Sequence, residues 1–141
     1  MKELRMRIRP LLAATVVSLA ASVALVGCSS DDGATASVTT VGADRLVEVA
    51  DTADATIIDV RTPEEYAAGH VEGALNINVE SPTFADEIAQ LPKDETYVIY
   101  CRSGNRSAAA AVQMADAGFT DLYDVDAGLA TLAEAGVALT Q

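Results

Sequence analysis

The sequence predicts an α/β fold in which a parallel sheet is covered by helices on both faces. Short apolar segments of strand length alternate with helix-like segments from residue 37 onward. Two of the apolar runs, residues 55–60 and 96–100, lack a regular polar alternation, as expected of strands that are buried on both faces. The connections between segments are short. This alternation favours βα units and therefore parallel strands.

Five segments are predicted to be strands because they are short, apolar or β-branched, and bounded by turn or helix signals. The second segment ends in Asp59, and the fourth runs directly into a cysteine, Cys101. Ligands of parallel sheets bind beyond the carboxyl ends of the strands, so Cys101 lies where such a site is expected. The predicted strands are residues 37–41, 55–60, 73–79, 96–100 and 120–125.

Five segments between or after these strands are predicted to be helices. Leu46 and Val49 lie at helical spacing in the first. The second opens on Thr62 as a candidate N-cap, with Pro63 at the first helical position. The alanine-rich fourth helix ends at Gly118. The predicted helices are residues 42–51, 62–69, 81–91, 107–118 and 128–136.

The first 27 residues predict an export signal rather than part of the fold. A basic start precedes a segment without charge that ends in LVGC, residues 25–28, and this ending resembles a bacterial lipobox. We expect cleavage before Cys28, lipid on its thiol, a flexible tether over residues 28–36 and one domain over residues 37–141. A retained single-pass anchor is the alternative, because the apolar run approaches the ~20 residues that span a bilayer. Either arrangement places the domain outside the cytoplasmic membrane.

The charge of the chain excludes several classes of partner. The formal net charge is −12, and removing residues 1–27 leaves 5 basic against 20 acidic residues, a net charge of −15. Such a surface argues against binding of nucleic acid or of anionic lipid headgroups, so we expect membrane contact through the lipid anchor only. If Cys28 carries lipid, Cys101 is the one remaining thiol and no intramolecular disulfide can form.

The loop CRSGNRS, residues 101–107, has the composition of an anion-binding nucleophile loop. A helix N-terminus and the charges of Arg102 and Arg106 lower the pKa of a nearby thiol. Gly104 lets consecutive N–H groups turn inward, and Ser107 can cap the following helix. We therefore predict that Cys101 is a nucleophile rather than a packing residue at the end of a strand. One histidine and one free cysteine cannot form a zinc site, so no metal or organic cofactor is expected.

The spacing within the loop separates two chemistries. Four residues lie between Cys101 and Arg106, whereas cysteine phosphatases have five between the corresponding residues. The smaller ring suits a sulfur atom better than a tetrahedral phosphate. A phosphatase or arsenate reductase on the same fold stays open as an alternative. So does a non-catalytic module that binds a partner or carries a persulfide in the cell envelope.

Three segments together resemble the signatures of the rhodanese family. They are IIDVRTPEEYAAGHVEGALNINV, YCRSGNRSAAAA and GFTDLYDVDAGLATL, and the resemblance spans about residues 37–137. It implies a three-layer α/β/α fold with a five-stranded parallel sheet. It also implies a sulfurtransferase that moves sulfur from a small anionic donor such as thiosulfate to cyanide or a thiol, through a persulfide on Cys101. We take a monomer as the default.

The resemblance also implies roles for single residues. The backbone amides of the loop wrap the persulfide, and its arginine side chains steer the donor; this persulfide-binding loop consists of Arg102, Ser103, Gly104, Asn105, Arg106 and Ser107. Asp59 and Arg61 are expected to form a structural ion pair that orients the loop after their strand. His70, Tyr66 and Tyr100 are expected to be structural, with Tyr100 contributing packing.

The C-terminal signature departs from the family pattern at two positions. Ala127 and Leu132 stand where the family usually has Gly and Trp. We expect thinner packing near the site and no effect on the nucleophile itself.

Overall fold

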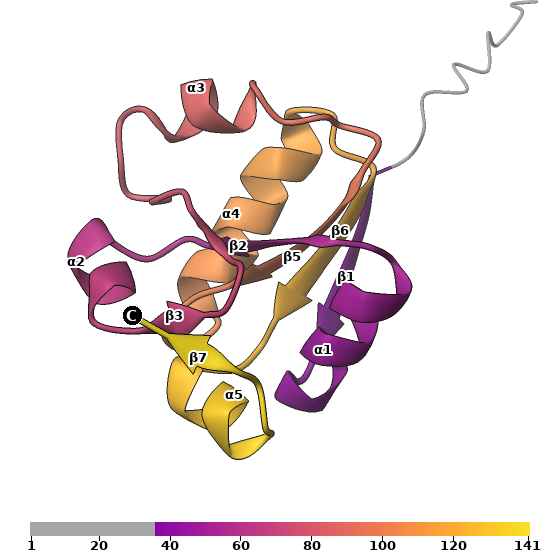
Figure 1. Ribbon diagram of the computed structural model, residues 1–141. Helices are drawn as coiled ribbons and strands as arrows, with labels where there is room; N and C mark the ends of the chain where they lie inside the picture. Colours follow the sequence, from indigo (N-terminus) through magenta and orange to yellow (C-terminus); the bar gives the residue numbers. More distant parts are fainter. Residues whose placement is uncertain (1–35) are drawn as a thin grey trace, which may run out of the picture. The chain divides into compact units, whose positions relative to one another are not determined.

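Five parallel strands form the central sheet, in the order β1-β6-β5-β2-β4 (Figure 1). The computed structural model describes residues 36–141. The strands are β1 (Ser37–Val41), β2 (Thr56–Asp59), β4 (Leu75–Asn76), β5 (Thr96–Tyr100) and β6 (Asp121–Val125). They match the five predicted segments, and the predicted α/β fold is confirmed. β5 occupies the middle of the sheet, and Cys101 follows its carboxyl end.

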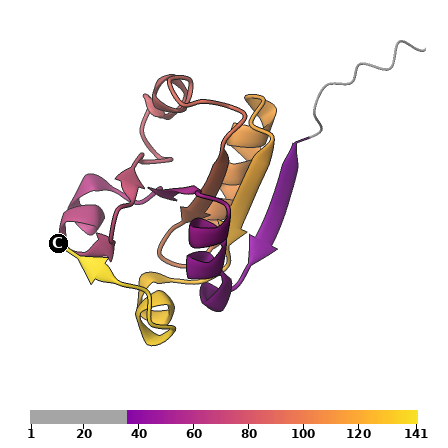
Figure 2. The same ribbon diagram turned by 45° about the vertical axis from the view of Figure 1, so that its right-hand side comes forward.

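Helices cover both faces of the sheet (Figures 1 and 2). On one face, α3 (Phe84–Ile88) and α4 (Asn105–Asp116) pack against β2, β5 and β6. On the other face lie α1 (Ala43–Thr52) and α5 (Leu129–Glu134). The short helix α2 (Pro63–Ala67) buries none of its residues. The two helical layers produce two separate hydrophobic clusters, one on each face.

Side chains of β5 alternate between these two clusters. Tyr97, Ile99 and Cys101 belong to the cluster under α3 and α4, whereas Val98 and Tyr100 belong to the cluster under α1 and α5. The alternation follows from the pleat of the strand. It places the thiol of Cys101 on the same face of the sheet as α4.

A two-stranded antiparallel ribbon joins β3 (His70–Val71) to β7 (Leu139–Thr140) and was not among the predicted elements. Each strand has two residues, which is too short for a period-two pattern to appear in the sequence. The pairing holds the C-terminal end of the domain against the segment that follows α2.

The start of α4 also differs from the prediction. The helix begins at Asn105, two residues before the expected start, and its N-cap is Gly104 in a left-handed conformation with φ 86°. Ser107 is therefore not the N-cap. It is the third residue of the helix, where its side chain turns back toward the loop.

No helix within residues 36–141 combines the length and apolar character needed to cross a membrane. The predicted signal over residues 1–27, the lipidation of Cys28 and the tether up to residue 35 lie outside the described residues.

Candidate active site

The sulfur of Cys101 lies at the centre of the loop between β5 and α4. The side chain is 0% exposed. The N–H of Gly104 donates to Sγ at 3.1 Å, and the thiol lies 3.6 Å from Oγ of Ser107. The backbone N–H groups of Ser103 and Ser107 also point at the sulfur. The loop is therefore an inward-facing ring of donors around one sulfur atom, as its composition predicted.

These donors change the acidity of the thiol. Burial by itself would raise the pKa of Cys101, since it penalises the charged form. Hydrogen bonds from Ser103 N–H, from the hydroxyl and N–H of Ser107 and from Gly104 N–H outweigh that penalty and hold the pKa below its ordinary value. The thiolate is the reactive form of cysteine, so the loop favours the nucleophile.

Two glycines let the loop approach its neighbours closely. A Cβ on Gly104 would lie 2.5 Å from Oδ1 of Asp126, and its φ of 86° is unfavourable for other residues. A Cβ on Gly128 would overlap the backbone carbonyl oxygen of Arg102. The loop after β6 therefore supports the loop after β5 from the side.

Arg106 is held by two carboxylates. Its guanidinium donates to both oxygens of Glu65 at 2.8 and 2.9 Å and to Glu80 at 3.1 Å. The hydrogen bond from Arg106 is the main cause that lowers the pKa of Glu65 to about 2. These pairs raise the pKa of Arg106 further above its usual value. Arg106 thus ties the first turn of α4 to α2 and to the segment after β4, while the side chain of Arg102 is exposed.

A buried polar network fixes the chain where it leaves β2. Arg61 bonds both carboxylate oxygens of Asp59, with its shortest contact at 2.6 Å, and also donates to the carbonyl of Gly69 at 2.7 Å. Asp59 and Arg61 thus form an ion pair, which was expected. Tyr100, expected to contribute packing, also donates to Asp59 at 2.6 Å and accepts from the N–H of Val71 at 2.9 Å. Burial is the main cause that raises the pKa of Tyr100.

His70 and Tyr66 stack on each other near this network. Their ring centroids are 3.6 Å apart, and Nδ1 of His70 lies 2.9 Å from the carbonyl of Tyr66. The hydroxyl of Tyr66 donates to the carbonyl of Ala74 at 2.7 Å. These contacts join α2 to β3 and the following turn.

A cavity of about 460 Å³ opens beside the loop. Arg61, Arg102 and Glu65 line it together with Gly128 and Thr131. Because Arg61 is paired with Asp59 and Glu65 with Arg106, the exposed guanidinium of Arg102 is, within residues 36–141, the unpaired charge among these three lining residues.

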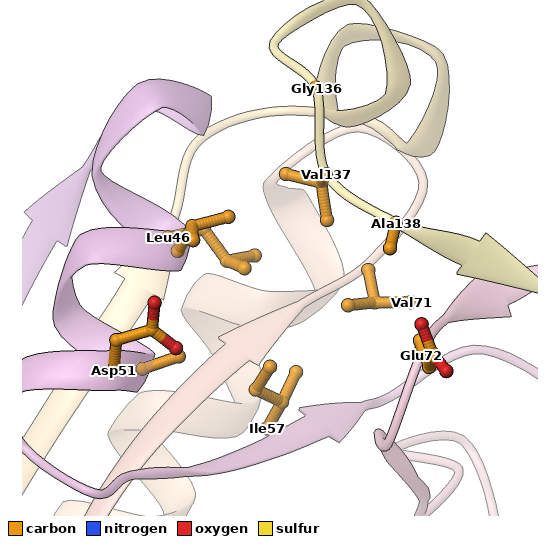
Figure 3. A pocket seen from close by; sticks show the side chains of 10 residues that line it. Leu46, Asp51, Ile57, Val71, Glu72, Gly136, Val137 and Ala138 are labelled. Carbon is orange, nitrogen blue, oxygen red and sulfur yellow. The ribbon is translucent and has the colours of Figure 1, made fainter.

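A second hollow, of about 380 Å³, lies between α1 and β3, on the face of the sheet opposite to the thiol of Cys101 (Figure 3). Leu46, Ile57 and Val137 form part of its apolar wall, and Asp51 and Glu72 lie at its sides. It contains no nucleophile.

The two departures from the family pattern lie in the same hydrophobic cluster. Leu132 is fully buried in the cluster under α1 and α5, together with Val98 and Val125. Ala127 is 8% exposed and belongs to the same cluster. Neither residue lines the 460 Å³ cavity beside the loop.

Several residues of the site had no assigned role in the sequence. Glu65 lies in the first turn of the predicted helix 62–69, where it completes a capping box with Thr62. The sequence around Glu80 and Asp124 gives no indication of a role in the site. All three residues are identified only by their neighbours in the folded protein.

Comparisons with known proteins agree with this geometry. The family model for the rhodanese-like domain matches residues 42–135. The thiosulfate sulfurtransferase GlpE of Pseudomonas putida is 38% identical over 74 residues, which cover 52% of this chain and 66% of that protein. The probable adenylyltransferase/sulfurtransferase MoeZ of Mycobacterium tuberculosis is 37% identical over 78 residues, covering 55% of this chain and 20% of that protein. The chain thus spans just under two thirds of the length of the GlpE relative.

Solved structures show the same fold. A rhodanese-related protein from Thermoplasma volcanium matches with a TM-score of 0.63 and 28% identity, covering 72% of this chain and 97% of that one. The rhodanese-like domain of an Anabaena protein matches with a TM-score of 0.62 and 25% identity, covering 72% and 77% of the two chains.

Proposed function

The chain belongs to the rhodanese-like domain family, and from this premise we propose that it is a sulfurtransferase that carries sulfur as a persulfide on Cys101. One observation supports the proposal above all others. The sulfur of Cys101 is buried within a ring of N–H and O–H donors that lowers its pKa. A ring of this kind stabilises a thiolate before attack and an anionic persulfide afterwards.

The first half-reaction loads the cysteine. The Cys101 thiolate attacks the sulfane sulfur of a small anionic donor such as thiosulfate, a new S–S bond forms, and sulfite leaves with the electron pair of the broken bond. The exposed side chain of Arg102, at the edge of the 460 Å³ cavity, attracts the donor. Arg106 is engaged with Glu65 and Glu80, so its contribution is to hold the loop in shape.

The second half-reaction removes the outer sulfur from Cys101. A thiophilic acceptor, cyanide or a thiol, attacks the outer sulfur, and Cys101 leaves as a thiolate into the same ring of donors. Two separate displacements on one cysteine predict ping-pong kinetics.

The short ring also favours sulfur over phosphorus. Only four residues separate Cys101 from Arg106, and the N–H of Gly104 already contacts the sulfur at 3.1 Å. An aryl phosphate assay tests the alternative: phosphate release without sulfur transfer would support a phosphatase.

We further propose that the domain is exported and anchored by lipid at Cys28. The support is the basic start, the uncharged segment and the LVGC ending of residues 1–28. The mass of the protein after extraction from membranes tests this proposal. A mass that retains residues 1–27 without lipid would contradict it.

The central test is the mass of the protein after incubation with thiosulfate, with the modified residue located by peptide mapping. We expect one added sulfur atom on Cys101, none in a Cys101→Ala variant, and loss of the added atom with formation of thiocyanate when cyanide follows. No added sulfur on the wild-type protein, with thiosulfate or another sulfane donor, would refute the proposed function.

A further inference from the structure

Asp124 is a buried acid for which the proposed reaction has no role so far. Its side chain is 5% exposed, and within residues 36–141 its Oδ1 atom accepts no hydrogen bond. A buried carboxylate without a partner is costly, because nothing in the protein replaces the water it has lost. Burial is the main cause that raises the pKa of Asp124, and the charge of Asp126 raises it further.

The position of Asp124 in the sheet brings it close to the nucleophile. Asp124 lies on β6 and is paired with Ile99 of β5. Ile99 precedes Cys101 by two residues. Leu122, two residues earlier on β6, packs in the cluster under α4, so the pleat directs Asp124 to the same face. Ser107 of α4 lies against this part of β6, with its Oγ 3.4 Å from the carbonyl oxygen of Val125, and its interaction with Asp124 partly offsets the rise in the pKa of Asp124.

Other charged groups around Asp124 are few. Its partners on the adjacent strands are Thr40 of β1 and Ile99 of β5, and neither titrates. On α4, the guanidinium of Arg106 is engaged with carboxylates of other elements. Within the described residues, Asp126 is the one charge that raises the pKa of Asp124 by its proximity.

The hydroxyl of Ser107 connects the acid to the thiol. Its oxygen lies 3.6 Å from the sulfur of Cys101, and it donates to the carbonyl of Gly104 at 2.9 Å, with the carbonyl of Val125 at 3.4 Å. A hydroxyl has one proton, so Asp124 can accept it only in place of the carbonyls of Gly104 and Val125. Rotation about a single bond is enough to exchange one acceptor for another.

We propose that Asp124 is a positioning residue that takes up the proton of Cys101 through the hydroxyl of Ser107, so that the site keeps one buried negative charge, on either the carboxylate or the sulfur. The inference rests on the proposed function, because it explains how the attacking thiolate forms. Two like charges this deep in the protein disfavour each other, so the pair holds one proton between them.

The proton transfer balances without any other reactant. The S–H bond of Cys101 breaks and its proton passes to Oγ of Ser107, which gives its own proton to the carboxylate of Asp124. The products are a thiolate, an unchanged serine and a neutral carboxylic acid. When the acceptor later removes the outer sulfur, Cys101 leaves as a thiolate and the proton can return by the same route.

The rate of alkylation of Cys101 by iodoacetamide, measured on the full chain as a function of pH and located by peptide mapping, tests the relay. The wild-type rate should rise in two steps, because thiolate forms first with the acid neutral and again after the acid ionises. In Asp124→Asn the rise should become a single step at lower pH. Between the two wild-type steps the rate should be higher in Asp124→Asn, by up to about tenfold for each unit that the charge of Asp124 adds to the pKa of Cys101.

Two further variants separate the relay from a simple field effect. Asp126→Asn removes a nearby charge that raises the pKa of Asp124, so the step of Asp124 should move to lower pH while both steps remain. Ser107→Ala removes the link, so adding Asp124→Asn to it should change the profile far less than Asp124→Asn changes the wild type. An Asp124→Asn profile that superimposes on the wild type, or a single-step profile in Asp126→Asn, would overturn the proposal. If Asp124→Asn does not fold, Asp124→Ser removes the same carboxylate and takes its place.

Alkylation needs no sulfur donor, so this test is independent of the proposed function. A two-step profile in a protein that takes up no sulfur from thiosulfate would retain the relay and refute the sulfurtransferase. Sulfur uptake from thiosulfate together with a single-step wild-type profile would refute the relay and retain the sulfurtransferase.

Discussion

Replacing Glu65 by Gln should remove the ion pair that ties α2 to the start of α4. In the structure both oxygens of Glu65 accept from Arg106, at 2.8 and 2.9 Å. Oε2 also accepts from the N–H of Thr62 at 3.2 Å and completes a capping box. Glutamine has the same length and can retain the capping interaction. The substitution therefore isolates the contribution of the charge.

The magnitude follows from the pKa of Glu65, which falls from 4.5 to about 2. At 1.36 kcal/mol per unit the shift corresponds to at most ~3 kcal/mol. The side chains of Arg106 and Glu65 are 24% and 27% exposed, so solvent screening reduces the expected loss to about 1–2 kcal/mol. Because the folded pKa is lower than the unfolded one, this stability is present above pH 4.5 and is lost as the pH falls toward about 2.

Urea unfolding at a series of pH values measures this loss. The free energy of unfolding of Glu65→Gln should lie about 1–2 kcal/mol below that of the wild type at neutral pH, and the two should converge near pH 2. Glu64→Gln, an exposed neighbour in the same turn of α2, is the matched control and should change stability by less than about 0.5 kcal/mol. A difference that persists undiminished in acid, or an equal loss in Glu64→Gln, would show that the Glu65–Arg106 ion pair is not the source of this stability.

Two more substitutions test the loop and the network beneath it. Gly128→Ala places a methyl group on the carbonyl oxygen of Arg102, so the loop must shift by roughly 1 Å, and sulfur uptake by the nucleophile should slow on the order of 10²-fold. Gly42→Ala is the matched control, because Gly42 is also an extended helix N-cap but a Cβ added there would contact only a side chain that can move. Equal slowing of sulfur uptake in both variants would contradict the prediction. Tyr100→Phe leaves the N–H of Val71 without its acceptor and should cost about 1–3 kcal/mol in urea unfolding. An unchanged unfolding midpoint in Tyr100→Phe would show that water replaces the lost hydroxyl.

Much of the fold and the core of the candidate site could be predicted from the sequence, because their signals are local. The five sheet strands match short apolar or β-branched segments, and the helices match stop signals and apolar spacing, although α4 begins two residues before its expected start. A cysteine that directly follows the apolar run 96–100 had to lie at the end of a buried strand. The spacing from Cys101 to Arg106 and the presence of Gly104 describe a short ring of backbone donors before any coordinates are known.

Other features depend on residues that are far apart in the chain and meet only in the folded protein. Arg106 is paired because Glu65, 41 residues earlier, and Glu80, 26 residues earlier, reach it across the site. The antiparallel ribbon pairs His70 with Thr140 over segments too short to show a pattern. The hydroxyl of Tyr100 finds Asp59 only because β2 lies beside β5.

Propensity, spacing and capping act over a few neighbouring residues, and they were enough to identify Cys101 as the candidate nucleophile and to describe the kind of loop around it. The folded chain alone shows which of the two loop arginines is engaged by carboxylates and which buried acid lies near Ser107. Those outcomes depend on burial and on contacts across the sheet, and a carboxylate such as Asp124 looks the same in sequence whether solvent or the core surrounds it.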